Sequence, residues 1–424
     1  MRQLGTGDHM RDSAEPRPRR APRRGVYVHF PFCLAKCPYC DFVSYAKAPA
    51  SIDHRRYADI VLDELARRSA PVSVSGGALP RVSCSGGAAP PPVGSVFFGG
   101  GTPSLWEPRE LGRVLSGIRG RLDCVDAHGG NAGLEVTVEC NPTSIDEDRA
   151  RALADVGVER VSIGVQGLDD ARLKYLGRLH DARLGVAAVK GALRSGLGRV
   201  SADIIFGLPD QTPEQARDEA MALVDLGLEH LSAYQLTIES GTRFGELAKR
   251  GRLPLADEGA VAESFLAIDE AMAARGFVHY EISNYARPGH ESRHNLGYWR
   301  GDEYLGLGCA AVGFAREGGK PASGVRWRND PSPDRYEDGN AGETVEALDA
   351  ESLMKERIML GLRLAEGVDL AEAEADLGAL GWTEERERTA RWLVERGRVV
   401  REGARLRVPR AAWLWTDDTA ARLF

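Results

Sequence analysis

The chain has 424 residues and a net charge of −7 at neutral pH, with 43% hydrophobic and 28% charged residues. This composition is ordinary for a soluble globular protein, and the acidic balance argues against nucleic acid as a partner, because nucleic-acid-binding proteins usually carry a basic domain. No apolar run approaches the ~18 residues of a membrane span, and the polar N-terminus lacks the apolar segment of a secretory signal.

The N-terminal third of the chain is predicted to begin with a disordered tail. Residues 1–24 are polar and rich in Arg and Pro, which favours disorder. Ordered structure is expected to start with a short strand at 25–30, followed by a helix at about 51–68. The next segment, 71–92, is rich in Gly, Ser, Pro and Ala and has no apolar period. It predicts a flexible insertion, and Cys84 within it is not expected to be functional.

A repeated strand–helix pattern follows the insertion. The predicted strands are 95–98, 134–139, 160–165, 199–205 and 230–236. Helices are predicted between them, for example at 149–156, 182–195 and 213–226. Such alternation is typical of βαβ units around a parallel sheet. Together with the first strand it gives about six units, which predicts an α/β fold with a partial (β/α)6 barrel over residues 25–245.

The remaining sequence divides into two parts. Residues 246–345 are expected to extend the barrel, with a helix at 257–275, a Gly- and aromatic-rich stretch at 277–314 and a loop-like stretch at 317–345. Residues 346–424 show three amphipathic helices and two short strands, which predicts a small α+β winged-helix-like module. The acidic charge of the chain favours a packing or interaction role for this module over DNA binding.

The strongest chemical signal is a cysteine array directly after the first predicted strand. Cys33, Cys37 and Cys40 have the spacing C-x3-C-x2-C. Three thiolates on one loop can hold three irons of a [4Fe–4S] cluster and leave the fourth iron open to another ligand. A structural zinc site usually needs four ligands and a second cysteine pair, which does not follow here. The absence of a signal sequence predicts reduced thiols in the cytoplasm.

This array resembles the signature of the radical S-adenosylmethionine (SAM) superfamily. The resemblance implies that the open iron binds SAM, that one electron from the cluster cleaves SAM to a 5′-deoxyadenosyl radical, and that an electron donor such as flavodoxin or ferredoxin is needed. A glycine-rich turn follows the second strand, and polar residues follow or end the next ones. These residues are Gly100, Gly101, Thr102, Glu139, Gln166 and Asp203. Functional groups gather at the carboxyl ends of barrel strands, so a shared cofactor site is expected there.

Longer segments resemble the coproporphyrinogen-oxidase-like (HemN/HemW) family, from about residue 25 to 315. They are 27–33, 100–104, 163–166, 176–178 and 206–209. The resemblance implies that SAM is contacted by Tyr27, Gly100, Glu139, Gln166, Arg178 and Asp203, with Gly101 and Thr102 beside them. The chain departs from the family pattern in three places: Gly167 stands where Ser is usual, Val312 stands where His is usual, and the 71–92 insertion is foreign to the pattern.

Two kinds of protein in this family have to be distinguished. The oxygen-independent coproporphyrinogen III dehydrogenase has a further cysteine two residues after the array, but here that residue is Phe42. The segment from His294 to Trp299 matches the HNxxYW motif of the haem chaperones. This resemblance implies that His294 contacts haem, whereas a hydrogen-bonding loop histidine is the alternative from the residues alone.

The sequence therefore favours a haem chaperone. It would carry a [4Fe–4S] cluster and SAM and pass haem to acceptor haemoproteins, including membrane-bound respiratory enzymes. The protein is expected in the cytoplasm and also at the surface of the inner membrane. The alternatives are decarboxylation of coproporphyrinogen III by the dehydrogenase reaction and radical chemistry on an unrelated substrate.

Overall fold

A computed structural model describes residues 23–69, 90–125, 133–316, 323–339, 342–377 and 381–424. The predicted basic tail lies outside the described residues except for residues 23 and 24. Most of the predicted insertion, including Cys84, also lies outside them. Among the described residues, no helix combines the length and the apolar character that crossing a bilayer requires.

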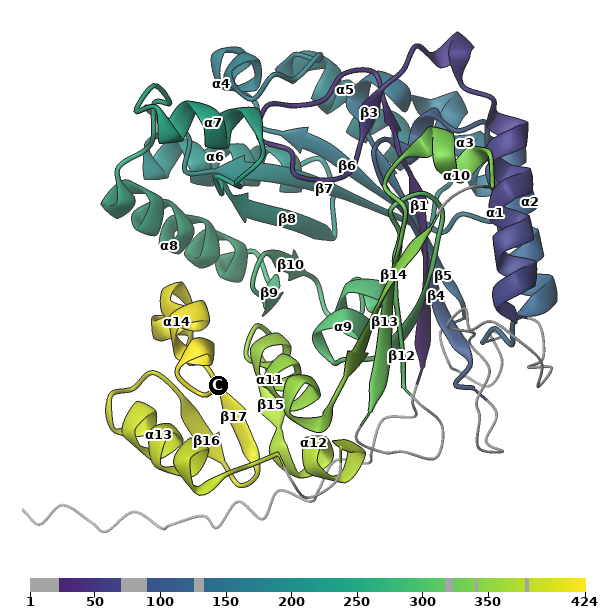
Figure 1. The fold of residues 1–424 in the computed structure, drawn as a ribbon. Coiled ribbons are helices and arrows are strands. Elements are labelled where there is room, and N and C mark those ends of the chain that lie inside the picture. Colours follow the sequence, from purple (N-terminus) through teal and green to yellow (C-terminus); the bar gives the residue numbers. More distant parts are fainter. Residues whose placement is uncertain (1–22, 70–89, 126–132, 317–322, 340–341, 378–380) are drawn as a thin grey trace, which may run out of the picture.

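A twelve-stranded sheet forms the centre of the molecule (Figure 1). Six neighbouring strands of it run parallel: β1 (Arg24–Phe30), β4 (Val93–Gly100), β5 (Glu135–Cys140), β6 (Arg160–Gln166), β7 (Arg199–Phe206) and β8 (His230–Gln235). All six were predicted, within three residues at each end. Arg24 opens β1, so the predicted tail ends one residue too late. The α/β fold with a partial barrel is confirmed.

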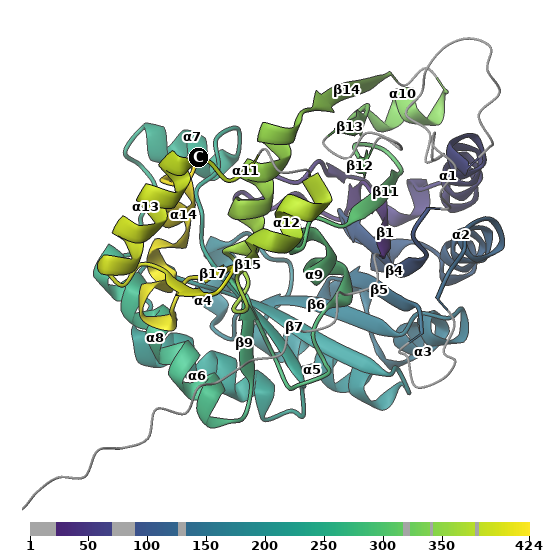
Figure 2. The ribbon, with the colours of Figure 1, turned by 90° about the horizontal axis from the view of Figure 1, so that it is seen from below.

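Helices cover the outer side of the curved sheet (Figure 2). They are α1 (His54–Ser69), α2 (Pro108–Arg121), α3 (Glu147–Asp155), α4 (Asp170–Tyr175), α5 (Ala182–Arg194), α6 (Pro213–Val224), α7 (Arg243–Lys249) and α8 (Glu258–Ala274). Several begin at a capping side chain; Asp181, for example, accepts the backbone N–H of Leu184 at 2.7 Å. The outer face of the strands is apolar and fully buried, as at Val26, Val96 and Val138. Because side chains alternate along a strand, the polar residues of the same strands face the opposite, concave side.

The extension after the barrel adds strands to both edges of this sheet. These are β9 (Val278–Glu281) and β10 (Asn284–Ala286) at one edge, and β11 (Glu303–Leu307), β12 (Val312–Arg316), β13 (Gly324–Asn329) and β14 (Glu343–Leu348) at the other. The prediction of a loop-like stretch at 317–345 is wrong for its described part, which holds β13, α10 (Pro333–Glu337) and the start of β14. The side chains of β14 are mostly exposed, because it is an edge strand, so its sequence lacks the alternation that marks a half-buried strand.

One short helix lies on the concave side of the sheet. Helix α9 (Arg293–Trp299) contacts β1 and β4 and also packs against the C-terminal module. Its first turn is capped by Ser292, whose hydroxyl accepts the backbone N–H of Asn295 at 3.4 Å. Seen from below, α9 lies close to the first helices of the C-terminal module (Figure 2). The segment with the HNxxYW motif is therefore held between the barrel and the module.

The C-terminal module has a core of its own below the barrel (Figure 1). Its elements are α11 (Ala350–Gly361), β15 (Val368–Asp369), α12 (Leu370–Leu377), α13 (Glu384–Glu395), β16 (Val400–Glu402), β17 (Arg405–Arg407) and α14 (Thr416–Ala421). The predicted three helices and hairpin are present. β15 completes a three-stranded sheet in the order β15-β17-β16. This strand of two residues is too short to leave a sequence pattern.

Candidate cofactor site

The three cysteines of the array lie on one loop at the carboxyl edge of the parallel strands. Cys33 ends the two-residue strand β2 (Phe32–Cys33), which pairs with β3 (Tyr45–Ala46). The backbone N–H of Lys47 donates to the carbonyl of Cys33 at 2.9 Å, and that of Cys40 donates to the carbonyl of Cys37 at 3.2 Å. These bonds close the loop at its base and turn it at its tip, so all three half-buried thiols belong to one rigid segment.

Side chains from two other segments of the chain reach the thiols. The hydroxyl of Thr102, just after β4, donates to Sγ of Cys33 at 3.4 Å. Nη1 of Arg178, after α4, donates to Sγ of Cys37 at 3.4 Å. Burial raises the pKa of Cys33, and it raises the pKa of Cys40 to about 11, with a smaller contribution from the other two thiols. These two thiols are therefore protonated at neutral pH until a metal takes the place of the proton.

The geometry of the loop suits a cluster better than a single ion. Among the described residues, no three His, Cys, Asp or Glu side chains lie close enough together to hold one metal ion. A cubane is larger than an ion, and each of its irons takes its own thiolate. Three separate thiols on one closed loop, two of them receiving hydrogen bonds, fit such a cluster.

The concave face next to this loop carries the residues expected to bind SAM. The backbone N–H of Gly100 donates to the carboxylate of Glu139 at 3.1 Å. A Cβ atom at Gly99 would lie 2.8 Å from the ring of Tyr27 and 3.1 Å from Oε2 of Glu139. The serine Oγ of Ser162 donates to Asp203 at 3.0 Å. The strands thus bring Tyr27, Glu139 and Asp203 to one surface, where Gly99 leaves room for the side chains of Tyr27 and Glu139.

Two buried carboxyl groups give this surface its electrostatic character. Burial, together with a smaller effect of the nearby charge of Asp203, raises the pKa of Glu139 to about 7. Burial also raises the pKa of Asp203, against the opposing effect of hydrogen bonds from Ser232 and Ser162. A buried pair of carboxyl groups is stabilised by a ligand that brings positive charge or hydrogen-bond donors. The ammonium and hydroxyl groups of SAM provide both.

The residues at the end of β6 have unsatisfied polar atoms. Oε1 of Gln166 and Nε of Arg178 are buried and have no hydrogen-bond partner among the described residues. Gln166 also has a positive φ of 68°, which is uncommon outside glycine. Buried polar atoms are nearly always paired in native proteins, so these two atoms fit a bound polar group beside the cysteine loop.

One residue that the sequence reasoning missed joins the two halves of this site. Nε2 of His29 lies 2.8 Å from the carbonyl of Val43 in the cysteine loop, and its Nδ1 lies 3.0 Å from the hydroxyl of Tyr27. A carbonyl can only accept, so Nε2 carries the proton and the Tyr27 hydroxyl donates to Nδ1. Burial lowers the pKa of His29 to about 4, which keeps it neutral. The alternation of Tyr27 and His29 along β1 was the available signal.

His294 occupies a different environment from the one expected of a haem ligand. Its Nδ1 lies 2.9 Å from Oγ of Ser95, and its Nε2 lies 3.0 Å from the hydroxyl of Tyr298. The ring is buried and stacks on Phe97 at a centroid distance of 4.9 Å. Burial lowers the pKa of His294 to about 4. Neither ring nitrogen is free to bind iron in this conformation, so its placement matches the hydrogen-bonding alternative.

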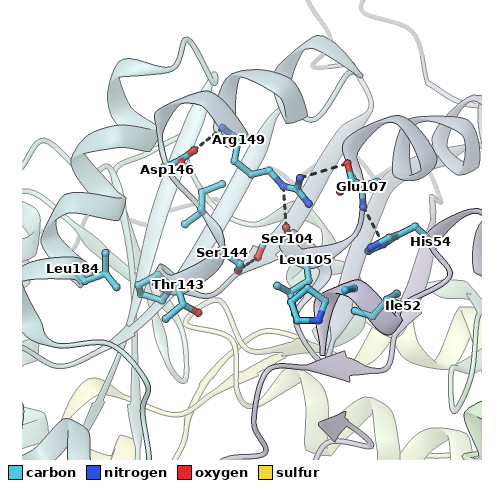
Figure 3. A pocket seen from close by; sticks show the side chains of 14 residues that line it. Ile52, His54, Ser104, Leu105, Glu107, Thr143, Ser144, Asp146, Arg149 and Leu184 are labelled. Atoms are coloured by element: carbon cyan, nitrogen blue, oxygen red, sulfur yellow. Dashed lines mark hydrogen bonds and ion pairs between the residues drawn. The ribbon is translucent and has the colours of Figure 1, made fainter. Parts of the chain in front are cut away.

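A surface pocket of about 800 Å³ lies outside the turns that follow β4 and β5 (Figure 3). Arg149 crosses it, donating from Nε to the carbonyl of Ser104 at 3.1 Å and from Nη2 to that of Trp106 at 2.7 Å. None of the residues expected to bind the cluster, SAM or haem lines this pocket. It therefore lies beside the glycine-rich turn but apart from the candidate site.

Comparisons with known proteins identify the family of this chain. The profile of the radical SAM superfamily matches residues 27–224, and that of the HemN C-terminal domain matches residues 348–415. "Heme chaperone HemW" of Escherichia coli K12 is 37% identical over 295 residues, covering 69% of this chain and 71% of that protein. Its namesake in Mycobacterium tuberculosis is 34% identical over 359 residues, covering 83% and 84%.

A solved structure shows the same fold. The radical SAM coproporphyrinogen III oxidase HemN of Escherichia coli superposes with a TM-score of 0.73 at 19% identity, covering 96% of this chain and 91% of that one. At this identity the likeness concerns the fold alone. The sequence relatives, in contrast, are similar over most of both chains. The chain belongs to the HemW family of radical SAM proteins.

Proposed function

We propose that this protein binds haem as its cargo and transfers it to acceptor haemoproteins, with a [4Fe–4S] cluster and SAM as resident cofactors. The observation that carries this proposal is Phe42, an exposed side chain where the dehydrogenase pattern has a further cysteine. The relatives named heme chaperones support the same function. The dehydrogenase reaction remains the alternative, because three cysteines and a complete SAM surface are also what that reaction needs.

The geometry supports a proposed set of residues that would hold the cofactors. Cys33, Cys37 and Cys40 would each bind one iron, and SAM would take the open iron. The concave face would hold the rest of SAM through Tyr27, Gly100, Gly101, Thr102, Glu139, Gln166, Arg178 and Asp203. When bound, the cluster supplies single electrons, and an electron donor such as flavodoxin or ferredoxin would have to reduce it.

The protein's own residues keep this site ordered. Arg178 fixes Cys37 against β6, because it also donates to the carbonyl of Gly164 at 2.9 Å. His29 ties Tyr27 to the cysteine loop, so the loop and the SAM surface move together. Both connections are partly buried, where hydrogen bonds are more costly to break than at the open surface.

The proposal also includes the binding partners and the cellular location. Haem would be collected and released in the cytoplasm. Acceptors would include respiratory haemoproteins in the inner membrane, which the protein would reach from its cytoplasmic surface. Nucleic acid is not proposed as a partner, in keeping with the net charge of −7.

An anaerobic assay separates the two functions. Protein with a reconstituted cluster is incubated with SAM, a reductant and coproporphyrinogen III, and products are followed by mass spectrometry. The same preparation is titrated with haem and then mixed with an apo-haemoprotein. We expect no protoporphyrinogen, saturable haem binding and transfer of haem to the acceptor. Multiple turnovers to protoporphyrinogen would overturn the chaperone function despite Phe42, as would a failure to bind haem.

A further inference from the structure

A second cavity, of about 220 Å³, lies next to α9, where β1, β4 and β11 begin. The cysteine loop lies at the opposite end of these strands: it follows the C-terminal end of β1 and contacts Thr102, just after β4. Four arginines line the cavity: Arg23, Arg24, Arg293 and Arg300. The carboxylates in the lining are those of Asp302 and Glu303, so the wall of the cavity has an excess of positive charge.

Two of these arginines can accept an anionic ligand without losing their present contacts. Arg23 forms no ion pair or hydrogen bond with any residue that the structure describes. Arg300 contacts Glu366 through Nε and Nη2 at 2.9 Å. A guanidinium has five N–H donors, so Arg300 retains others for a second acceptor. Arg293 is less suitable for binding an anion, because it already donates hydrogen bonds to Glu135, Glu159 and the carbonyl of Gly133.

Aromatic surface adjoins the charged wall. The rings of Tyr298 and Tyr304 line the cavity and meet edge to face at a centroid distance of 4.7 Å. Both side chains are partly exposed. A wall that combines arginines and tyrosines suits a flat apolar ligand with carboxylates at its edge.

The size of the cavity limits what can enter. Pockets for drug-sized ligands typically measure about 300–1,000 Å³. A cavity of about 220 Å³ is too small for a whole tetrapyrrole but admits one edge of it. The remainder of the ring would lie outside the cavity mouth.

We propose that this cavity binds the propionate edge of haem, with the two carboxylates at Arg23 and Arg300 and the ring edge against Tyr298 and Tyr304. This inference rests on the proposed haem-carrying function and assigns the residues that recognise the cargo. It places haem beside α9, where His294, which also lines the cavity, supports Tyr298 through their hydrogen bond.

The test compares haem with its dimethyl ester, in which both propionates have lost their charge. Both are titrated into full-length, cluster-loaded protein. Wild-type protein should bind haem about tenfold more tightly than the ester, the difference expected from a charge-assisted hydrogen bond. The double variant Arg23→Gln/Arg300→Gln should lose this preference while its affinity for the ester stays the same. Arg250→Gln, at an exposed arginine directly after helix α7, is the matched control and should bind like wild type.

The single variant Arg23→Gln separates a loss of binding from misfolding. Arg23 forms no hydrogen bond or ion pair with the described residues, whereas Arg300 also donates to Glu366. The single variant should lose part of the preference at an unchanged melting temperature. Equal binding of haem and ester by the wild type, or an equal loss of both in the variants, would overturn the propionate site and leave the chaperone function standing. Absence of any haem binding by the wild type would overturn both.

Discussion

Oγ of Ser95 on β4 lies 2.9 Å from Nδ1 of His294 on α9. This contact starts a column of rings, because His294 stacks on Phe97 and Phe97 stacks on Tyr27 at a centroid distance of 6.3 Å. Tyr27 in turn belongs to the surface that would hold SAM. The helix with the HNxxYW motif and the proposed cofactor surface are therefore joined through one packed column on the concave face, a physical route by which binding at one could affect the other.

Cys33→Ala should abolish stable cluster assembly. Two thiolates hold a cubane poorly, and Cys33 is the residue that links the loop to β3. The measurement is iron and sulfide content together with visible absorbance after anaerobic reconstitution. Cys124→Ala, outside the array, is the control and should assemble a full cluster. Full iron–sulfur absorbance in Cys33→Ala would remove this residue from the ligand set.

Arg178→Gln should lower the reduction potential of the cluster. The guanidinium donates to Sγ of Cys37 and is buried, so it favours the more negatively charged, reduced cluster. Losing a hydrogen bond from a charged donor corresponds to a change on the order of 50–100 mV. Arg178→Lys keeps the charge and should show a smaller shift. Potentiometric titration of the three proteins measures both, and an unchanged potential in Arg178→Gln would contradict the contact with Cys37.

The fold could be read from the sequence where the chain alternates strands and helices. The strands carry apolar residues at alternating positions, as in β5 (Glu135–Cys140), and they alternate with helical segments, a pattern that predicts βαβ units. The strands after residue 300 gave no such signal. β14 is an exposed edge strand, and β11 pairs in parallel with β1 from the other end of the chain, a long-range contact that local patterns do not encode.

The sequence predicts which residue types make up the candidate site, but it does not predict the hydrogen bonds and packing around each of them. The spacing of Cys33, Cys37 and Cys40 identifies cluster chemistry because three thiols on one loop suit few other groups. The motif around His294 identifies a candidate imidazole ligand. Whether its ring nitrogens are free to bind iron depends on Ser95, which is 199 residues away in the sequence. Tertiary packing decides this, and no local pattern reports it.

Glu139→Gln should change the pH dependence of stability. Because the pKa of Glu139 is raised from 4.5 to about 7, the folded protein keeps a proton that the unfolded chain releases. Stability is therefore lost as pH rises through that window. Gln has no such proton and can still accept the N–H of Gly100. Without SAM, the variant should be more stable than wild type by on the order of 2–3 kcal/mol above about pH 7, and similar to it near pH 4.5.

Thermal melts across this pH range measure the difference between the two proteins. Titrating groups that do not interact with Glu139 are the same in both proteins and cancel, whereas the neighbouring Asp203 contributes to the difference. A difference that does not vary with pH would show that Glu139 has an ordinary pKa. At pH 8 the same variant should bind SAM more weakly, because it lacks the carboxylate charge that faces the ligand.

His294→Ala should destabilise the protein without changing the ligation of bound haem. The substitution leaves a cavity on Phe97 and removes the partners of Ser95 and Tyr298, which together cost about 2–4 kcal/mol. Ser95→Ala removes one of these contacts and should cost about 1 kcal/mol. Chemical denaturation measures both losses. Haem affinity should fall modestly in His294→Ala, because Tyr298 loses its anchor, while the Soret and visible bands stay at their wild-type positions. A shift of those bands in His294→Ala but not in Ser95→Ala would mean that the imidazole leaves its buried place and binds the haem iron.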